Sequence, residues 1–190
     1  MDRRKFILGI LNNHKGFDKQ EEQSRQEIIR FVSSHKECFQ NDFRLGQITG
    51  SAFVVDRKME YTLLTHHIHL NRWFQFGGHS DGDWNSLEVA WREAHEESGL
   101  TTLEYVPGWK GIFDVDVHNI LPREDMPEHK HYDVRILLTA DMSEPYIISH
   151  ESHDLQWIKL EEARKYNTQH AFLRLVTKVK RIKTYNVLVK

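Results

Sequence analysis

The sequence is poor in cysteine, since Cys38 is the only one among 190 residues. A single cysteine excludes an internal disulfide and fits a reducing compartment, so we expect a cytoplasmic protein. Nothing near Cys38 in the sequence supplies the electropositive setting of a reactive thiolate. We therefore expect Cys38 to be a buried structural residue.

Long apolar runs and an excess of charge are also absent. No apolar run approaches the ~20 residues of a membrane-spanning helix. The short apolar patch at residues 6–11 lacks a following cleavage site of small residues, so we expect a helix there and not a signal peptide. The formal net charge is −2, and the one basic run, residues 178–183, is interpreted as a solvated helix end. We expect neither a membrane nor a nucleic-acid polymer as a partner.

The composition is that of an ordinary globular protein, with 39% hydrophobic and 28% charged residues. A chain of this length can form one domain with a proper core. Residues 1–40 are expected to be helical, and residues 48–55 and 61–67 are expected to pair as an antiparallel hairpin. Further strands are expected at 103–106, 111–117, 131–140 and 155–158, and further helices from residue 160 and over 171–182. Helices that surround a run of strands predict an α+β class.

A glycine-rich loop at residues 77–83 leads into the most informative helix of the sequence. Four apolar residues recur at helical spacing and form one stripe: Leu87, Ala90, Trp91 and Ala94. Asn85 or Ser86 is the expected N-cap, and Gly99 is the expected C-cap. A loop of glycines ahead of such a helix lets backbone approach a phosphate or a metal ion closely.

Three acids on this helix lie three and four residues apart, so Glu93, Glu96 and Glu97 share one face. Like charges at this spacing repel one another by a few tenths of a kcal/mol, roughly, for each pair. A divalent cation would offset that repulsion, because hard cations prefer oxygen ligands. On the residues alone, a metal site and a solvated acidic helix face remain alternatives.

Gly78 and the run Arg92-Glu93-Ala94-His95-Glu96-Glu97-Ser98-Gly99-Leu100 resemble the Nudix box. The resemblance to the Nudix (MutT-like) hydrolases covers roughly residues 46–165. It implies an α/β/α sandwich, with a mixed, curved sheet between helices, and a domain over residues 46–190 behind a helical extension at 1–45. It also implies hydrolysis of a pyrophosphate bond in a nucleoside diphosphate linked to another group.

One position departs from the Nudix pattern, because the early glutamate of the box falls on Trp84. The neighbouring Asp83 could supply a carboxylate after a shift of one residue. The loop at 77–83, the segment at 129–135 and the Cys38-Phe39 pair are similar to a bacterial subgroup of the family that has a helical N-terminal extension. The departure affects fine positioning and not the class of reaction.

The resemblance implies roles for individual residues. Mg²⁺ or Mn²⁺ would be bound by the Gly78 carbonyl, Glu93, Glu96 and Glu97, and Arg92 would orient Glu93. The catalytic candidates are Arg92, Glu93 and Glu97, together with Glu151, because several relatives carry an acid in the corresponding loop. The alternative for Glu151 is an ordinary surface residue, and which carboxylate serves as the general base stays open.

The group attached to the diphosphate is expected to be recognised by aromatic faces and histidines. The candidates for substrate contacts are Trp73, Phe76, His79, Trp84 and His131. Core packing is the alternative for the aromatic residues. The histidines around the loop and the later strands could contact phosphate, form a second metal site, or lie at solvated strand ends. The expected partner is a small nucleotide derivative, and a homodimer is compatible with the sequence.

Two other classes of function are alternatives for a chain with this pattern. A Nudix-fold module that binds a nucleotide and regulates a partner often lacks acids of the box, whereas all three are present here. An isomerase on the same scaffold needs a reactive cysteine near the loop, and Cys38 lies well before it. The sequence therefore favours a hydrolase.

Overall fold

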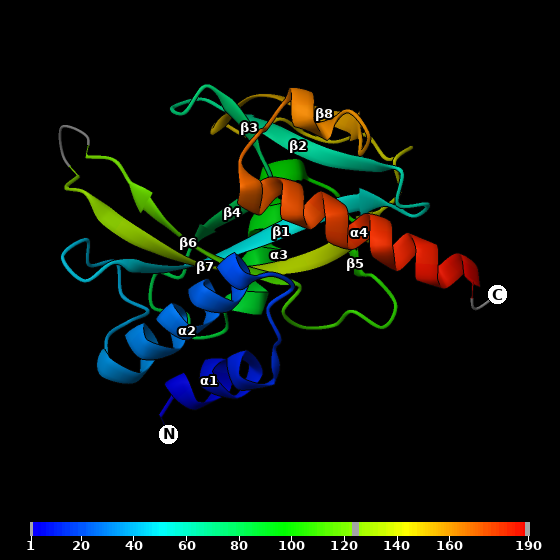
Figure 1. Ribbon diagram of the computed structural model, residues 1–190. Helices are drawn as coiled ribbons and strands as arrows, with labels where there is room; N and C mark the ends of the chain where they lie inside the picture. The colour runs from blue at the N-terminus through cyan, green and yellow to red at the C-terminus, as the bar shows by residue number, and fades with distance from the viewer. Residues whose placement is uncertain (1, 123–125, 189–190) are drawn as a thin grey trace. The chain divides into compact units, whose positions relative to one another are not determined.

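The computed structural model describes residues 2–122 and 126–188. Its helices are α1 (Arg4–Asn13), α2 (Lys19–Ser34), α3 (Ser86–Ser98) and α4 (His170–Leu188), with a 3₁₀ turn η1 (Ala163–Lys165) (Figure 1). Its strands are β1 (Gln47–Asp56), β2 (Tyr61–His67), β3 (Arg72–Phe74), β4 (Phe76–His79), β5 (Glu104–Tyr105), β6 (Asp114–Ile120), β7 (His129–Ala140) and β8 (Ser152–Lys159). None of the described helices is long and apolar enough to cross a membrane.

The strands are hydrogen-bonded in the order β3-β2-β1-β7-β5, with β4 beside β1, β6 beside β7 and β8 beside β2. The hairpin expected from the sequence is present, because Val54 of β1 pairs antiparallel with Leu63 of β2. Strand β2 also pairs antiparallel with β3 and β8, and β7 pairs antiparallel with β5 and β6. The α+β class is confirmed, with helices added to an open sheet.

Contacts divide the chain into two compact units. The first unit comprises Met1–Ser51, Gly77–Glu93 and Gly111–Ile136, and the second comprises Ala52–Phe76, Ala94–Lys110 and Leu137–Lys190. Strands β1 and β7 and helix α3 each contribute residues to both units.

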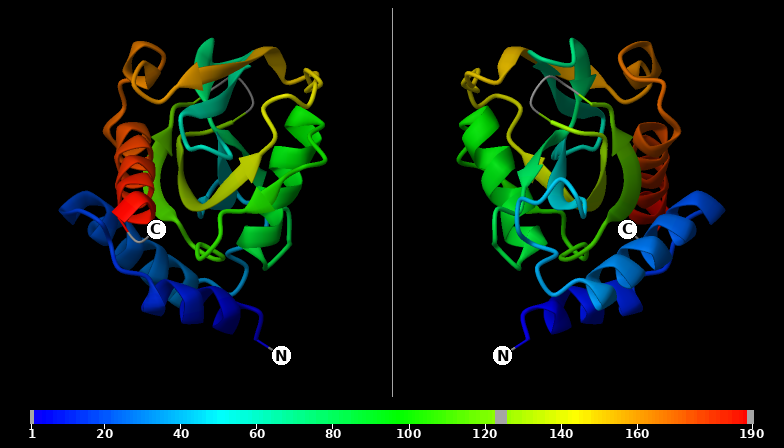
Figure 2. Two further views of the ribbon diagram at one scale, coloured as in Figure 1. Left: turned by 90° about the vertical axis from the view of Figure 1, so that its right-hand side faces the viewer. Right: turned by 90° about the vertical axis from the view of Figure 1, so that its left-hand side faces the viewer.

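The core of the first unit joins the two N-terminal helices to strands. Helices α1 and α2 lie side by side (Figure 2). Their apolar faces bury Ile7, Leu11, Ile28, Phe31 and Val32 in one cluster with Ile48, Val115, Tyr132 and Val134. The rings of Phe31 and Tyr132 stack with centroids 4.0 Å apart. The helical prediction for residues 1–40 is confirmed for α1 and α2, which are separated by a break that Asp18 ends as the N-cap of α2.

Cys38 belongs to the same core and is 1% exposed. Burial raises the pKa of the Cys38 thiol to about 11. A thiol with so high a pKa carries little thiolate at neutral pH. The expectation of a buried structural cysteine is therefore confirmed.

In the second unit, β2 pairs with β8 along its whole length, from Tyr61 opposite Lys159 to His67 opposite Ser152. Helix α4 packs Phe172 edge-on against Phe53, with ring centroids 6.0 Å apart. The helix expected from residue 160 is wrong, because only the 3₁₀ turn η1 forms there. The chain leaves the turn at Asn167, whose side-chain amide donates to the Trp73 carbonyl at 2.9 Å. That contact with β3 replaces the next turn of a helix.

Candidate active site

Helix α3 forms where its sequence signals predict it. The amide of Val89 donates to the Asn85 carbonyl at 3.0 Å, so the helical hydrogen bonds begin at the predicted N-cap. The helix ends at Gly99, which has φ +69° and donates its amide to the His95 carbonyl at 2.8 Å. A left-handed residue at this position favours glycine. Helix α3 therefore carries Glu93, Glu96 and Glu97 as expected.

The first turns of α3 lie unusually close to strand β1, and Gly50 makes this approach possible. A methyl group on Gly50 would lie 2.5 Å from the Ser86 carbonyl oxygen and 2.8 Å from the Ala90 amide nitrogen. Both atoms belong to the helix backbone and cannot swing aside. A residue without a side chain thus sets the distance between the strand and the helix that carries the acids.

The carboxylate of Glu93 lies against Gly78 at the end of β4. A methyl group on Gly78 would lie 2.6 Å and 2.7 Å from the two carboxylate oxygens. Nη2 of Arg92 lies 3.0 Å from Oε1 of Glu93, and the Glu93 side chain is 16% exposed. Two residues expected at the site, Gly78 and Glu93, are in contact, and Arg92 is paired with the acid.

The other two acids of the helix differ in burial. Glu96 is exposed, whereas Glu97 is only 6% exposed. A buried carboxylate needs a partner to remain charged. Within residues 2–122 and 126–188, no three His, Cys, Asp or Glu side chains are grouped so that they could hold a metal ion as they stand. The suitability of the site for a hard divalent cation therefore rests on its donors, which are carboxylate and carbonyl oxygens.

Backbone hydrogen bonds fix the glycine-rich loop. The amide of Ser80 donates to the Ile48 carbonyl at 3.1 Å, and the amide of Gly82 donates to the Phe39 carbonyl at 2.7 Å. Asp81 and Gly82 both have positive φ, at 47° and 88°. The loop is thus held between β1 and the segment that follows α2.

Trp84, which stands where the Nudix pattern has its early acid, contacts the N-terminal extension. Its ring meets Phe6 of α1 edge-on, with centroids 5.3 Å apart, and the residue is 37% exposed. Asp83 beside it is exposed. The tryptophan therefore connects the beginning of the box to α1.

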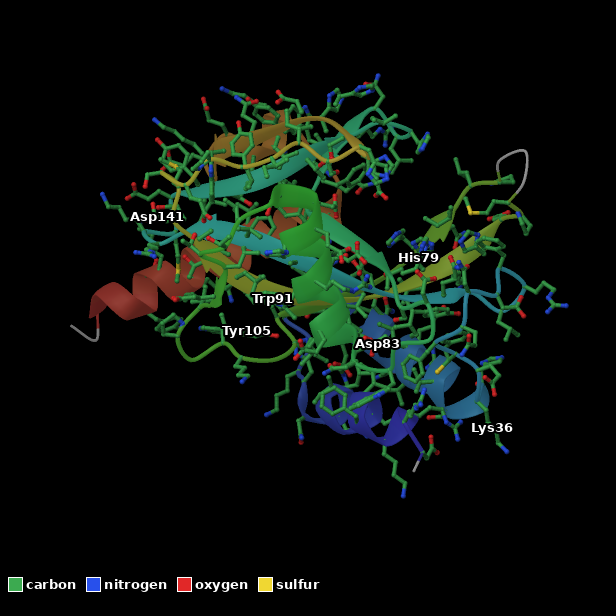
Figure 3. The ribbon with its side chains drawn as sticks, turned by 180° about the vertical axis from the view of Figure 1, so that it is seen from behind. Lys36, His79, Asp83, Trp91, Tyr105 and Asp141 are labelled. Atoms are coloured by element: carbon green, nitrogen blue, oxygen red, sulfur yellow. The ribbon has the colours of Figure 1, made fainter. Side chains whose placement is uncertain are left out.

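Four histidines of the first unit gather beside the loop: His79, His118, His129 and His131. The side chain of His79 lies beside strands β6 and β7 (Figure 3). Burial, together with the neighbouring histidines, lowers the pKa of His131 to about 3. His131 is therefore uncharged at neutral pH and offers no positive charge to a phosphate.

The remaining predicted residues lie in the second unit or in the core. Trp73 stacks on His66 with ring centroids 4.9 Å apart, and Tyr166 meets it edge-on. Phe76 is fully buried, which leaves it no surface to offer a substrate. Glu151 precedes β8, and its side chain is 56% exposed.

Sequence reasoning missed a buried polar ladder between β6 and β7. Asp114 pairs with Arg135, Asp116 with Asp133, and His118 with His131. Nε of Arg135 lies 2.6 Å from Asp133, which also accepts from Ser51 and Thr49 of β1 at 2.7 and 3.0 Å. The alternation of polar residues in β7 was visible, but some of the partners come from β1, which is more than 80 residues away in the sequence.

Residues 47–177 match the family model of the NUDIX domain. This match covers well over half of the chain, so the chain belongs to the Nudix family. The protein is accordingly a hydrolase, of the family whose members cleave pyrophosphate bonds. The Nudix resemblance of the sequence is confirmed.

Solved structures with the same fold share little sequence with this chain. A Nudix-family hydrolase of Clostridium perfringens is 24% identical, with a TM-score of 0.52 over 72% of this chain and 97% of that one. An Ap4A hydrolase of C. elegans in a binary complex is 18% identical, with a TM-score of 0.54 over 72% and 96%. The dihydroneopterin triphosphate pyrophosphohydrolase of E. coli is 10% identical, with a TM-score of 0.53 over 69% and 94%. No curated protein matches the chain.

Proposed function

We propose that the protein hydrolyses a pyrophosphate bond in a nucleoside diphosphate linked to another group, with Mg²⁺ or Mn²⁺ as its cofactor. One observation carries the proposal. The Glu93 carboxylate is paired with Arg92 and packed against Gly78, on the helix that also bears Glu96 and Glu97. An acid held in this way against a glycine backbone is poorly explained as a solvated helix face.

The donors fit a hard divalent ion, which Glu93, Glu96, Glu97 and the Gly78 carbonyl would hold. Such an ion, when bound, supplies positive charge to a pyrophosphate and makes water more acidic. The chain itself supplies the positioning, since Arg92 keeps the Glu93 carboxylate in place. Proton acceptance falls to a carboxylate, and Glu93, Glu97 and the exposed Glu151 are the candidates.

Substrate contacts are proposed for those predicted residues that keep some surface. Trp73, His79, Trp84 and His131 are each partly exposed. A ring face of Trp73 or Trp84 could stack on a base for about 1–3 kcal/mol. His131 would act as an uncharged hydrogen-bonding group because of its low pKa. Phe76 is assigned to the core.

The test is a screen for phosphate release with Mg²⁺ and with Mn²⁺. The panel comprises nucleoside triphosphates, oxidised nucleotides, ADP-ribose, dinucleoside polyphosphates and nucleotide sugars. On the best substrate, Glu97→Gln is expected to lose at least about 100-fold in kcat. Glu88→Gln is the matched control, because Glu88 is an exposed acid in the first turn of the same helix. Full metal-dependent turnover by Glu97→Gln would contradict the assignment.

One observation favours a second function, a catalytically weak module that binds a nucleotide and regulates a partner. Trp84 replaces the early acid of the box and packs against Phe6. The three acids of α3 argue for catalysis instead. No turnover across the panel, combined with tight binding of one member, would select the regulatory module.

We further propose a cytoplasmic location, which the single buried thiol of Cys38 supports. The division into an extension at 1–45 and a catalytic region at 46–190 is also a proposal, supported by the start of the family match at residue 47. A homodimer remains a prediction, which gel filtration with light scattering tests.

A further inference from the structure

We propose that His131 is a positioning residue, which holds His79 and thereby fixes the orientation of the Gly78 carbonyl beside the Glu93 carboxylate. This inference rests on the proposed function, because it gives the Gly78 carbonyl a role in the active site. It assigns His131 a task in the architecture of the loop, distinct from contact with a substrate.

The ring of His131 is the centre of a compact polar cluster in the first unit. Its Nε2 atom lies 3.3 Å from Nε2 of His79, 3.1 Å from Nε2 of His129 and 3.2 Å from Oε1 of Gln47. Nε2 of His129 lies 3.1 Å from the same Gln47 oxygen. Within this cluster His129 and Gln47 are buried, at 5% and 1% exposed, whereas His79 and His131 are half-buried.

The hydrogen bonds of the cluster depend on one another. Nδ1 of His129 lies 2.9 Å from the Pro127 carbonyl oxygen and must donate to it. A neutral imidazole nitrogen either donates or accepts, so Nε2 of His131 has a single role toward its neighbours. The tautomer of His79 is thereby coupled to that of His131. Loss of the His131 nitrogen should change the tautomer that His79 adopts.

The position of His79 affects the orientation of the Gly78 carbonyl through the backbone that joins the two residues. The Gly78 carbonyl and the His79 amide belong to one planar peptide unit, so the orientation of one fixes that of the other. Gly78 has no side chain of its own to restrict its dihedral angles. The pairing of β4 with β1 sets the course of this backbone, and the anchored ring of His79 and the Ser80 amide, which donates to Ile48, hold the residues that follow Gly78.

His131 stands on a rigid support. It pairs with His118 in the β6–β7 ladder, and two residues further along β7 Asp133 is 2% exposed and bound to Arg135. Side chains at alternate positions of a strand point to the same face. The ring thus projects from a strand whose neighbouring position is fixed by a buried ion pair, as a positioning residue requires.

The test compares three variants with the wild-type protein. His131→Phe keeps a ring of similar size and removes the nitrogen, and His131→Gln retains a side chain that can form hydrogen bonds. His118→Asn is the matched control, because the His118 side chain is 42% exposed and its ring neighbours His131 without sharing its nitrogen contacts. Circular dichroism and thermal unfolding establish that each variant is folded.

Three measurements are made on each protein. Mn²⁺ affinity is measured by electron paramagnetic resonance titration, kcat and KM are measured on the best substrate, and the His79 ring is observed by nitrogen NMR. We expect His131→Phe to lose about 10- to 100-fold in Mn²⁺ affinity or in kcat, the usual cost of removing an outer support of a metal ligand. We expect the His79 nitrogen shifts to move, and His131→Gln to recover part of the loss.

The inference is overturned if folded His131→Phe keeps wild-type Mn²⁺ affinity and wild-type shifts of the His79 ring. It is also overturned if His118→Asn produces the same losses as His131→Phe. Failure of the proposed function gives a separate result: the wild-type protein itself would then turn over no member of the panel. In that case, the Mn²⁺ titration and the His79 spectra still decide the role of His131.

Discussion

The carboxylate of Glu93 packs so closely on Gly78 that no methyl group fits between them, since its oxygens would lie 2.6 and 2.7 Å from an added Cβ. Gly78→Ala should displace the flexible end of Glu93 and leave the fold intact. We expect kcat to fall by about 100-fold, the cost of misplacing a catalytic group by roughly 1 Å. Steady-state kinetics and thermal unfolding measure the two effects separately.

The control for this variant is Gly9→Ala. Gly9 is exposed on helix α1, and an added Cβ would meet nothing within 4 Å. Alanine in an exposed helical position should stabilise the protein by about 0.5–1 kcal/mol without changing turnover. Wild-type kcat in folded Gly78→Ala would show that the Glu93 carboxylate can act from another position.

Gly50→Ala, in contrast to Gly78→Ala, is expected to reduce the stability of the fold. The added methyl group would meet the Ser86 carbonyl oxygen and the Ala90 amide, which are backbone atoms of α3. The helix must shift, and we expect the free energy of unfolding to fall by about 1–3 kcal/mol. Urea unfolding measures this loss. A loss below about 0.5 kcal/mol would mean that the close approach of strand and helix is not needed.

Arg135→Met should be strongly destabilising, because Arg135 is the cation among three buried acids: Asp114, Asp116 and Asp133. Removing one partner of a buried ion pair costs about 3–5 kcal/mol. Arg44→Met is the control, since the Arg44 side chain is 86% exposed and its pair with Asp42 lies at the surface. We expect that variant to change the free energy of unfolding by less than about 0.5 kcal/mol.

The pH dependence of stability should also change in Arg135→Met. Burial raises the pKa of Asp133, but the Arg135 guanidinium, His118 and the Ser51 hydroxyl together outweigh burial and hold this pKa below its ordinary value. The wild-type protein therefore keeps the contribution of Asp133 above pH about 4 and loses it as pH falls through the folded pKa. Without the cation, the pKa of Asp133 should rise, so the stability of Arg135→Met relative to the wild-type protein should decrease as pH increases from about 4 to 7. A difference between the urea midpoints of the variant and the wild-type protein that stays constant across this range would contradict this prediction.

His131 should make the protein less stable in mild acid. Its pKa is lowered from 6.5 to about 3, so between these values the unfolded chain binds a proton that the folded chain excludes. Stability due to this group is complete above pH 6.5 and declines as pH falls toward 3, by at most about 1.4 kcal/mol per pH unit. His131→Phe should lack this component, so its urea midpoint should fall less between pH 7 and 4.5. Equal slopes for the two proteins would disprove the assignment.

The contact between Trp84 and Phe6 should couple the box to the extension energetically. Edge-on aromatic pairs contribute about 0.5–1.5 kcal/mol beyond the area they bury. A double-mutant cycle with Phe6→Leu and Trp84→Leu should give a coupling energy in this range. Trp84→Glu, which restores the acid of the family pattern, should lose the same coupling. A coupling energy near zero would leave the tryptophan without a structural role in joining α1.

Local signals were sufficient where neighbouring residues decide the structure. The predicted hairpin at 48–55 and 61–67 corresponds to β1 and β2, and Asn85 and Gly99 bound α3 as expected. The same signals fail at residue 160, where the Asn167 contact with Trp73 ends the helix after one 3₁₀ turn. The partner of that contact lies almost a hundred residues away, so no local pattern indicates it.

Some residues of the candidate site were also indicated by the sequence, whereas others are brought together only by the fold. The pairing of Arg92 with Glu93 was indicated by the resemblance to the Nudix box and not by helix spacing, since adjacent residues of a helix do not face each other. The role of Trp84 as a substrate contact stays a prediction, and the sequence did not indicate that its ring also meets Phe6, on a helix that the family pattern does not include. The cluster around His131 needed Gln47 from β1 and His79 from β4, and only the folded sheet brings these residues together.

The lone thiol of Cys38 gives the protein a built-in reporter of opening. It is 1% exposed within the packing of α1 and α2, so a maleimide dye in neutral buffer can label it only in molecules whose N-terminal helices have come away. The labelling rate would therefore count such openings directly, without engineering a probe into the chain.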